Sequence, residues 1–309
     1  MPLDPQAQAI ADAMAQLPAP DFATLSVADY RAMLAAGPAL PTPDDALANV
    51  EDGRLPGPGG ALKTRTYRPP AAGPLPLTVF FHGGGFVSCG LDSHDNICRR
   101  LAARASTLVV AVDYRLAPEH KFPAAADDAA AAVRWLHAHA ASIGVDASRI
   151  AVAGDSAGGN LAAVVAQELR HMICHQLLFY PVTDFESDLP SKREFADAAM
   201  LTQEMMRWFA VNYLPDAQAA RDPRASPLRQ TEWRDIPSAT LITAACDPLR
   251  DEGEAYAQAL SKAGVAVTLR RWAGQFHGFA SLQGLLDGAE HALDFAASAL
   301  QQAFAAARP

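Results

Sequence analysis

The sequence lacks the features of a membrane or exported protein. No stretch approaches the roughly 18 consecutive apolar residues that a membrane-spanning helix needs. The opening segment MPLDPQAQAIADAMAQL has neither the basic start nor the long apolar run of a secretory signal. These absences predict a cytoplasmic protein that has no membrane partner.

Cysteine is also scarce, and the spacing of the cysteines argues against a zinc-bound or a disulfide-linked fold. Cys89, Cys98, Cys174 and Cys246 form no CxxC pair and match neither a zinc site nor a disulfide framework. We expect buried, reduced thiols.

Positive charge is in deficit. The chain has 25 Lys and Arg against 34 Asp and Glu, which gives a formal net charge of −9, and no Lys/Arg-rich run occurs. An acidic surface repels nucleic acid, so we expect no nucleic-acid partner. Aromatic residues are only 7% of the 309 residues, and the abundant alanine indicates helices packed closely on a sheet.

Short apolar runs alternate with helical patterns along most of the chain. This alternation predicts an α/β fold with a mostly parallel sheet and helices on both faces. Ligands bind such sheets at the carboxyl ends of the strands. The expected strands are 61–68, 77–81, 107–114, 149–154, 175–181, 239–246 and 265–272, and the expected helices are 124–142, 157–171, 250–263 and 285–307.

Two segments depart from this alternation. Residues 1–45 show helical spacing broken by prolines, and residues 184–235 contain helical patterns but no buried strand. We therefore predict an α/β core of residues 46–183 and 236–309, with both segments forming a cap over the crevice. Some of the apolar residues on one cap helix are candidates to line a pocket: Leu201, Met205, Met206, Trp208, Phe209 and Val211.

The strongest local motif is the G-x-S-x-G pattern from Gly154 to Gly158. The pattern alone is modest evidence, but here the buried run IAVAG precedes it and an alanine-rich helix follows it. A nucleophile elbow has this strand–turn–helix setting. Ser156 is therefore the candidate nucleophile.

A second motif, His82-Gly83-Gly84-Gly85, follows the apolar run LTVFF. Three glycines can expose backbone N–H groups, which an oxyanion hole requires. A phosphate-binding loop needs different spacing. We predict an oxyanion hole formed by Gly83, Gly84 or Gly85 together with Ala157.

A nucleophilic serine needs a base and an orienting acid. His277 follows the last expected strand and Asp247 follows the strand 239–246, in the chain order Ser, Asp, His of α/β-hydrolases. Asp251 and Glu252 are rivals, but an acid at a helix start has an ordinary role there. Other histidines, among them His94, have no clear partner in the sequence.

At these residues the sequence resembles the bacterial hormone-sensitive-lipase-like (family IV) esterases. The shared motifs are FHGGGFVSCG, VDYRLAPEHKFPAAADD, VAGDSAGGNLA, QLLFYPVTD, CDPLRDEGEAYA and FHGF, in the family's order over about residues 60–280. Phe86 stands where the family usually has an aromatic residue, often Trp.

The resemblance implies an α/β-hydrolase fold with an eight-stranded, mostly parallel sheet and a helical cap. It implies a serine carboxylesterase for short- to medium-chain acyl esters, with no metal or cofactor and with a homodimer as a possible assembly. It supports Ser156 as nucleophile, His277 as base and acid, and Asp247 as orienting acid.

Several points stay open at this level. Candidate substrate-binding residues are Phe86, Asp155, Met205, Phe209 and Phe279. The same triad also serves amide, carbamate and acetyl-sugar hydrolysis, and a non-catalytic small-molecule-binding relative is the alternative from another class. Such relatives tend to lose the histidine, which this chain retains.

The segment YRLAPEHKFPAAADD holds two further charged candidates. Arg115 and Glu119 are expected to form ion pairs that brace the loops around the site. We assign both a structural role.

Overall fold

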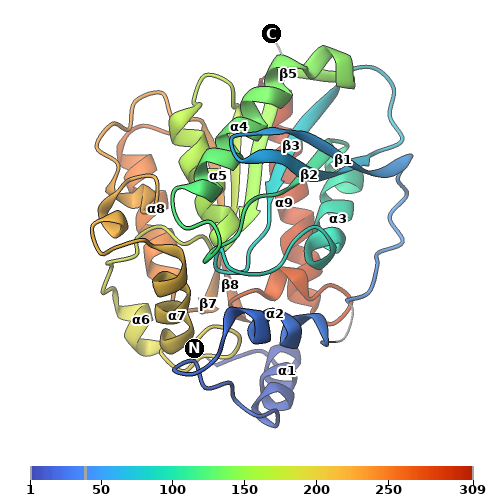
Figure 1. Ribbon diagram of the computed structural model, residues 1–309. Coiled ribbons are helices and arrows are strands. Elements are labelled where there is room, and N and C mark those ends of the chain that lie inside the picture. The colour runs from blue at the N-terminus through green and yellow to red at the C-terminus, as the bar shows by residue number, and fades with distance from the viewer. Residues whose placement is uncertain (1, 38–39, 308–309) are drawn as a thin grey trace.

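One eight-stranded sheet forms the centre of the protein (Figure 1). The computed structural model describes residues 2–37 and 40–307. The strand order is β1-β2-β4-β3-β5-β6-β7-β8, and only the pairings of β2 with β1 and β4 are antiparallel. The predicted mostly parallel sheet is confirmed. The strands are β1 (Asn49–Gly57), β2 (Gly60–Arg68), β3 (Leu75–Phe81), β4 (Leu108–Asp113), β5 (Val145–Asp155), β6 (His175–Phe179), β7 (Ser238–Cys246) and β8 (Val267–Phe276).

The central strands are apolar because both of their faces are covered. All residues of β3 and β6 are buried, as expected for parallel strands between two helical layers. Neighbouring side chains point to opposite faces. Val79 and Phe81 thus join one apolar cluster, and Phe80 joins a second.

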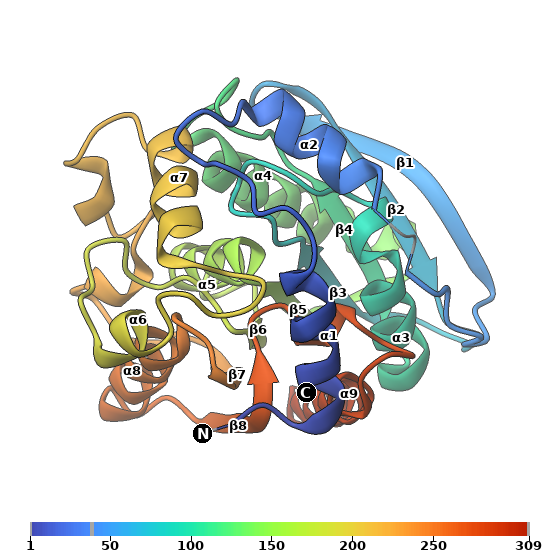
Figure 2. The same cartoon turned by 90° about the horizontal axis from the view of Figure 1, so that it is seen from below.

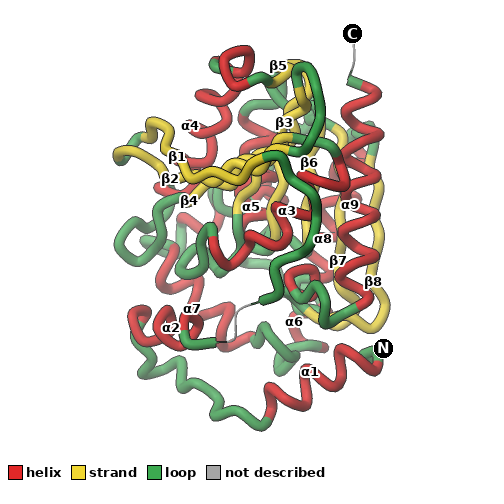
Figure 3. The backbone as a smooth tube through the Cα atoms, turned by 90° about the vertical axis from the view of Figure 1, so that its right-hand side faces the viewer, coloured by secondary structure: helices red, strands yellow, loops and turns green. Residues whose placement is uncertain are grey.

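Helices cover the two faces of the sheet in separate layers (Figure 3). Helices α3 and α9 contribute to one apolar cluster, and α4, α5 and α8 contribute to the other. The helices are α1 (Pro5–Ala15), α2 (Val27–Ala35), α3 (Asp95–Ala105), α4 (Ala124–Ala138), α5 (Ala157–Glu168), α6 (Pro190–Glu194), α7 (Gln203–Tyr213), α8 (Arg250–Lys262) and α9 (Asp287–Ala306). No helix among the residues described is long and apolar enough to cross a bilayer.

Three elements differ from the sequence-based expectation. Strand β1 and helix α3 were not predicted: β1 is largely polar and exposed, and α3 carries four charged residues. The predicted buried run 265–272 is wrong, because residues 268–271 of β8 are exposed. Strand β8 ends the strand order, so among the described residues no further strand pairs with its outer edge.

The helices of the two irregular segments lie together at one end of the sheet (Figures 1 and 2). Tyr30 of α2 packs edge-on against Trp208 and Phe209 of α7, with ring centroids 5.1 and 5.8 Å apart. The Trp208 indole N–H donates to the Leu25 carbonyl at 3.3 Å. Aromatic contacts therefore join segments far apart in the sequence. The predicted range 1–45 includes residues 1, 38 and 39, which lie outside the described residues.

Ion pairs hold the loops that follow the strands at this end of the sheet, as predicted for Arg115 and Glu119. Arg115 binds the fully buried Asp128 at 2.8 Å. Arg31 of α2 pairs with Glu119 at 2.7 Å and also donates to the carbonyls of Val87 and Ala117. Arg31 thereby ties α2 to the segment that follows the glycine motif.

Candidate active site

The sharp turn at Ser156 joins β5 to α5. Ser156 has φ 54° and ψ −115°, a conformation that L-residues rarely adopt. A Cβ on Gly158 would lie 1.9 Å from the Phe81 carbonyl oxygen, and one on Gly154 would lie 2.3 Å from the Gly158 oxygen. Glycine is therefore required at both positions, as the motif predicted. The turn presents the serine hydroxyl at the carboxyl end of the sheet.

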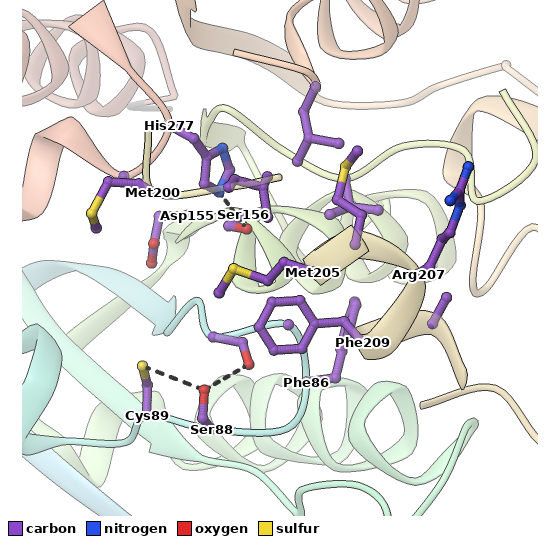
Figure 4. Close-up of a pocket in the computed structure, with 18 of the residues that line it drawn as sticks. Phe86, Ser88, Cys89, Asp155, Ser156, Met200, Met205, Arg207, Phe209 and His277 are labelled. Carbon is purple, nitrogen blue, oxygen red and sulfur yellow. Dashed lines mark hydrogen bonds between the residues drawn. The ribbon is translucent and has the colours of Figure 1, made fainter. Parts of the chain in front are cut away.

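Three predicted residues meet at this point. His277, directly after β8, has Nε2 2.9 Å from the Ser156 Oγ (Figure 4). Its Nδ1 lies 2.8 Å from the Asp247 Oδ2. An ionised carboxylate only accepts, so Nδ1 carries a hydrogen and Nε2 is free to accept from the serine hydroxyl. This arrangement can deprotonate the serine and stabilise the resulting imidazolium.

The Asp247 carboxylate is fully buried at the end of β7. Its Oδ1 accepts the Leu249 backbone N–H at 2.8 Å, which orients the other oxygen toward the histidine. The rivals Asp251 and Glu252 are engaged elsewhere: Asp251 pairs with Arg250, and Glu252 pairs with Lys192. Asp247 is thus the acid that the fold brings to His277.

The glycine motif lies beside the serine, but its three glycines differ in their hydrogen bonding. The Gly83 N–H donates to the Asp155 Oδ1 at 2.8 Å, so the prediction that it serves the oxyanion hole is wrong. Within the described residues, no acceptor is recorded for the N–H groups of Gly84 and Gly85. Ala157 opens α5, where the first N–H groups have no intrahelical acceptor. These three N–H groups remain available for a developing oxyanion.

A buried ion pair supports the glycine motif. His94, which follows β3 in the chain, places its Nε2 3.0 Å from the Asp155 Oδ1. Burial alone raises the pKa of the Asp155 carboxyl, but the charge and hydrogen bond of His94 outweigh it and hold that pKa below its usual range. Asp155 is therefore ionised at neutral pH. No partner for His94 could be predicted from the sequence, because Asp155 lies 61 residues further along the chain.

His82, the first residue of the glycine motif, is buried and packed against the core. His82 stacks on Tyr114 with centroids 4.3 Å apart, and the Tyr114 hydroxyl donates to the His82 carbonyl at 2.7 Å. Burial lowers the pKa of His82 to about 4, so the ring is neutral at pH 7. His82 thereby anchors the start of the motif without adding charge.

A cavity of about 380 Å³ opens above the serine. Met205 and Phe209 line it, as predicted, and Met205 reaches toward Ser156 (Figure 4). Phe86 also lines it and stacks on Tyr213 with centroids 3.8 Å apart. Most of the lining is apolar, which suits a small substrate with few polar groups.

Of the remaining residues predicted to line the cavity, some do and some do not. Leu201 and Met206 line it, whereas Trp208 and Val211 do not. Phe279 is fully buried beside Tyr180 and Trp272 and is absent from the cavity wall, so its predicted substrate contact is wrong. It follows His277 by two residues, but the intervening left-handed Gly278 turns the chain into the core.

Several residues that line the cavity were not among the predicted pocket residues. Tyr30 and Leu34 of α2 line it, and their spacing of four was the only sequence signal. Cys89 also lines it and is exposed, contrary to the expectation of buried thiols. Cys174 is partly exposed, and Cys89, Cys98 and Cys174 are free thiols. Among the residues described, no group of three or more His, Cys, Asp or Glu side chains could hold a metal ion.

Comparison with known proteins agrees with this geometry. A family model described as alpha/beta hydrolase fold matches residues 78–281. The chain belongs to this family. The α/β-hydrolase is 43% identical over 263 residues to the carboxylic ester hydrolase LipN of Mycobacterium tuberculosis, covering 82% of this chain and 70% of the relative.

Two further relatives point the same way. The ethyl acetate hydrolase of Pseudomonas putida is 40% identical over 252 residues, with 79% of each chain covered. The hyperthermophilic esterase of the archaeon Pyrobaculum calidifontis superposes with a TM-score of 0.91 at 38% identity, with 100% of both chains covered. The predicted resemblance to hormone-sensitive-lipase-like esterases is confirmed, and the α/β-hydrolase is a carboxylic ester hydrolase of the serine class.

Proposed function

We propose that Ser156, His277 and Asp247 are the catalytic triad of this ester hydrolase, and that Gly84, Gly85 and Ala157 provide its oxyanion hole. The observation that carries the proposal is the unbroken hydrogen-bonded chain from the Ser156 hydroxyl through His277 to the buried Asp247. Beside the serine lie the backbone N–H groups of Gly84, Gly85 and Ala157, which have no acceptor among residues 2–37 and 40–307. The site thus combines a nucleophile, a base and an electrostatic stabiliser.

The geometry supports a two-step reaction. His277 Nε2 takes the hydroxyl proton as Ser156 Oγ attacks the ester carbonyl carbon, and the carbonyl oxygen becomes an oxyanion held by the backbone N–H groups. The alcohol leaves with the proton from His277, and Ser156 keeps the acyl group. Water then repeats the sequence: it gives His277 a proton, attacks the acyl carbon and releases the carboxylic acid and the free serine.

The proposed substrates are esters of short- to medium-chain acids. A cavity of about 380 Å³ accepts a small ester but not a long extended chain without displacement of its wall. The relative named ethyl acetate hydrolase carries a short ester in its name and supports this size class. Met205 and Phe209 are the proposed limits of the acyl space.

Hydrolysis of p-nitrophenyl esters from acetate to palmitate, with Ser156→Ala beside the wild type, tests this function. We expect turnover that peaks at short to medium chains and is lost in Ser156→Ala. Unchanged hydrolysis by the variant would exclude the proposed nucleophile. A folded wild type that turns over no member of the series would redirect the search to amides, carbamates and acetylated sugars.

We further propose that residues 1–45 and 184–235 form the cap, which the aromatic contacts between α2 and α7 support. A homodimer through the outer edge of β8 is also proposed, because among the described residues no strand pairs with that edge and Leu269 on β8 is 42% exposed; Gly274, which accepts the Asp4 N–H, is covered there. Light scattering at increasing concentration tests the dimer. The free thiols of Cys89, Cys98 and Cys174 fit the proposed cytoplasmic location, which localisation of the tagged protein in its own cell tests.

A further inference from the structure

The glycine motif lies directly against one buried carboxylate. The Gly83 N–H donates to the Asp155 Oδ1 at 2.8 Å. A Cβ on Gly83 would come within 2.4 Å of the other oxygen, Oδ2. Gly83 precedes the two proposed donor glycines, Gly84 and Gly85. The Asp155 carboxylate therefore fixes the backbone position of Gly83, from which the peptide groups of Gly84 and Gly85 follow.

The Asp155 carboxylate is in turn held by His94, a residue that takes no part in the proposed reaction steps. His94 Nε2 lies 3.0 Å from the same Oδ1 and 3.3 Å from the Gly83 nitrogen. An ionised carboxylate only accepts, so Nε2 donates its hydrogen to Asp155, and the shorter 2.8 Å bond of the Gly83 N–H also goes to Asp155. His94 Nδ1 lies 2.8 Å from the Ser93 Oγ, which also accepts the Gly90 backbone N–H at 3.0 Å. Both ring nitrogens are thus engaged, and the ring is only 6% exposed.

We propose that His94 is a positioning residue for the oxyanion hole: through the Asp155 carboxylate it fixes Gly83, and with it the N–H groups of Gly84 and Gly85. The inference rests on the proposed catalytic function. His94 borders the same cavity as the serine, but its donor is directed to Asp155 rather than to the substrate.

The chemistry explains why this position needs support. Both donor glycines have positive φ, 106° at Gly84 and 62° at Gly85. The Gly84 carbonyl accepts from Val87 and Ser88 on the far side of the loop, so the hydrogen bond of Gly83 to Asp155 is what holds its near side. Oxyanion donors act only where charge develops in the transition state. A displaced loop should therefore lower kcat and leave KM nearly unchanged.

Substitutions at His94 can distinguish the effect of its hydrogen bond to Asp155 from the effect of having any polar side chain at this position. The amide nitrogen of glutamine can occupy the place of Nε2 and donate to Asp155. Asparagine is one methylene shorter and reaches only the place of Nδ1, near Ser93. His94→Gln and His94→Asn are therefore matched variants, both polar, of which only one restores the contact that matters.

The test compares kcat and KM for p-nitrophenyl butyrate, with active sites counted from the burst of p-nitrophenol. We expect His94→Asn and His94→Ala to lower kcat about 10- to 100-fold, since a displacement near 1 Å can cost about 100-fold. KM should stay within about threefold, and His94→Gln should recover to within about fivefold of wild type. Affinity for butylboronic acid, whose serine adduct is tetrahedral, should fall in parallel with kcat.

His175→Ala is the control for loss of a buried histidine. His175 is 5% exposed and bonded by Ser238 and Thr240, but it lies at the start of β6, opposite the site. We expect it to lower stability and leave kcat unchanged. Equal kcat in His94→Asn and His94→Gln would overturn the inference, even if His94→Ala failed to fold. Retained activity in Ser156→Ala would instead overturn the proposed function.

Discussion

The Phe209 ring lies directly over Gly85, so that a Cβ added to this glycine would be 2.3 Å from the ring. A residue of α7, in the proposed cap, is thereby in contact with a proposed oxyanion donor. The contact requires glycine for two reasons, the space and the positive φ of 62°. The Phe209 ring and the Gly85 backbone are therefore packed against each other at this point.

Gly85→Ala should lower kcat/KM for p-nitrophenyl butyrate by about 100-fold, as expected when an oxyanion donor is displaced. The second substitution in Gly85→Ala/Phe209→Ala removes the ring that clashes, so part of the activity should return. Gly264→Ala is the matched control: its φ is 83° but nothing lies within 4 Å, and we expect unchanged kinetics. A double variant no more active than Gly85→Ala would show that the clash is not the cause.

Met205→Ala should shift the chain-length optimum toward longer esters. The Met205 side chain reaches toward Ser156 inside the cavity, so its truncation lengthens the space for the substrate (Figure 4). Rates along the p-nitrophenyl ester series measure the shift. Val211→Ala on the same helix is the control, because Val211 is 73% exposed and outside the cavity. An unchanged optimum in Met205→Ala would remove Met205 from the acyl space.

Glu252→Gln should destabilise the fold strongly. The fully buried Glu252 carboxylate pairs with Lys192 at 2.7 Å and accepts the Thr183 N–H at 2.7 Å and the Ser187 hydroxyl at 2.8 Å. Breaking a buried, hydrogen-bonded pair typically costs about 3–5 kcal/mol.

Urea unfolding at pH 7 measures this cost. Glu254→Gln on the same helix is the control, since its pair with Arg271 is partly exposed and exposed pairs contribute about 0–1 kcal/mol. Equal losses in Glu252→Gln and Glu254→Gln would contradict the assignment of Glu252 as a buried anchor of the segment 183–187.

The geometry of the proposed catalytic residues could be predicted from the sequence because each residue follows a strand. Ser156, Asp247 and His277 stand at the carboxyl ends of β5, β7 and β8, and parallel strands bring these ends to one edge. The local pattern around Ser156 also requires its two glycines. Sequential order and strand ends were enough to assemble the site.

What the sequence could not predict depends on contacts between distant segments. His94 and Asp155 carry no mutual signal, and neither residue shows locally that the Gly83 N–H is already engaged. Phe279 follows His277 closely, yet the turn at Gly278 carries it away from the cavity. An apolar run such as 265–272 does not reveal whether its strand is central or at an edge, and β8 is at an edge.

A buried histidine far from the site should make stability depend on pH. Burial lowers the pKa of His175 from 6.5 to about 4. Above pH 6.5 the folded and unfolded chains both hold it neutral, so it has no effect there. Between pH 6.5 and 4 only the unfolded chain binds the proton, so the free energy of unfolding falls as the pH falls. Below pH 4 the loss levels off at about 3 kcal/mol, from about 1.4 kcal/mol per pH unit.

His175→Gln removes this titration and keeps polar groups near Ser238 and Thr240. The free energy of unfolding, measured in urea at half-unit steps from pH 7 to 4, should therefore fall less steeply in the variant than in wild type. The difference in slope should approach about 1.4 kcal/mol per pH unit near pH 5, one proton's worth. The exposed His139 gives the control, His139→Gln, whose profile should follow wild type. Parallel profiles for wild type and His175→Gln would mean that His175 is protonated in the folded chain, since only then does the unfolded chain gain no proton at this position.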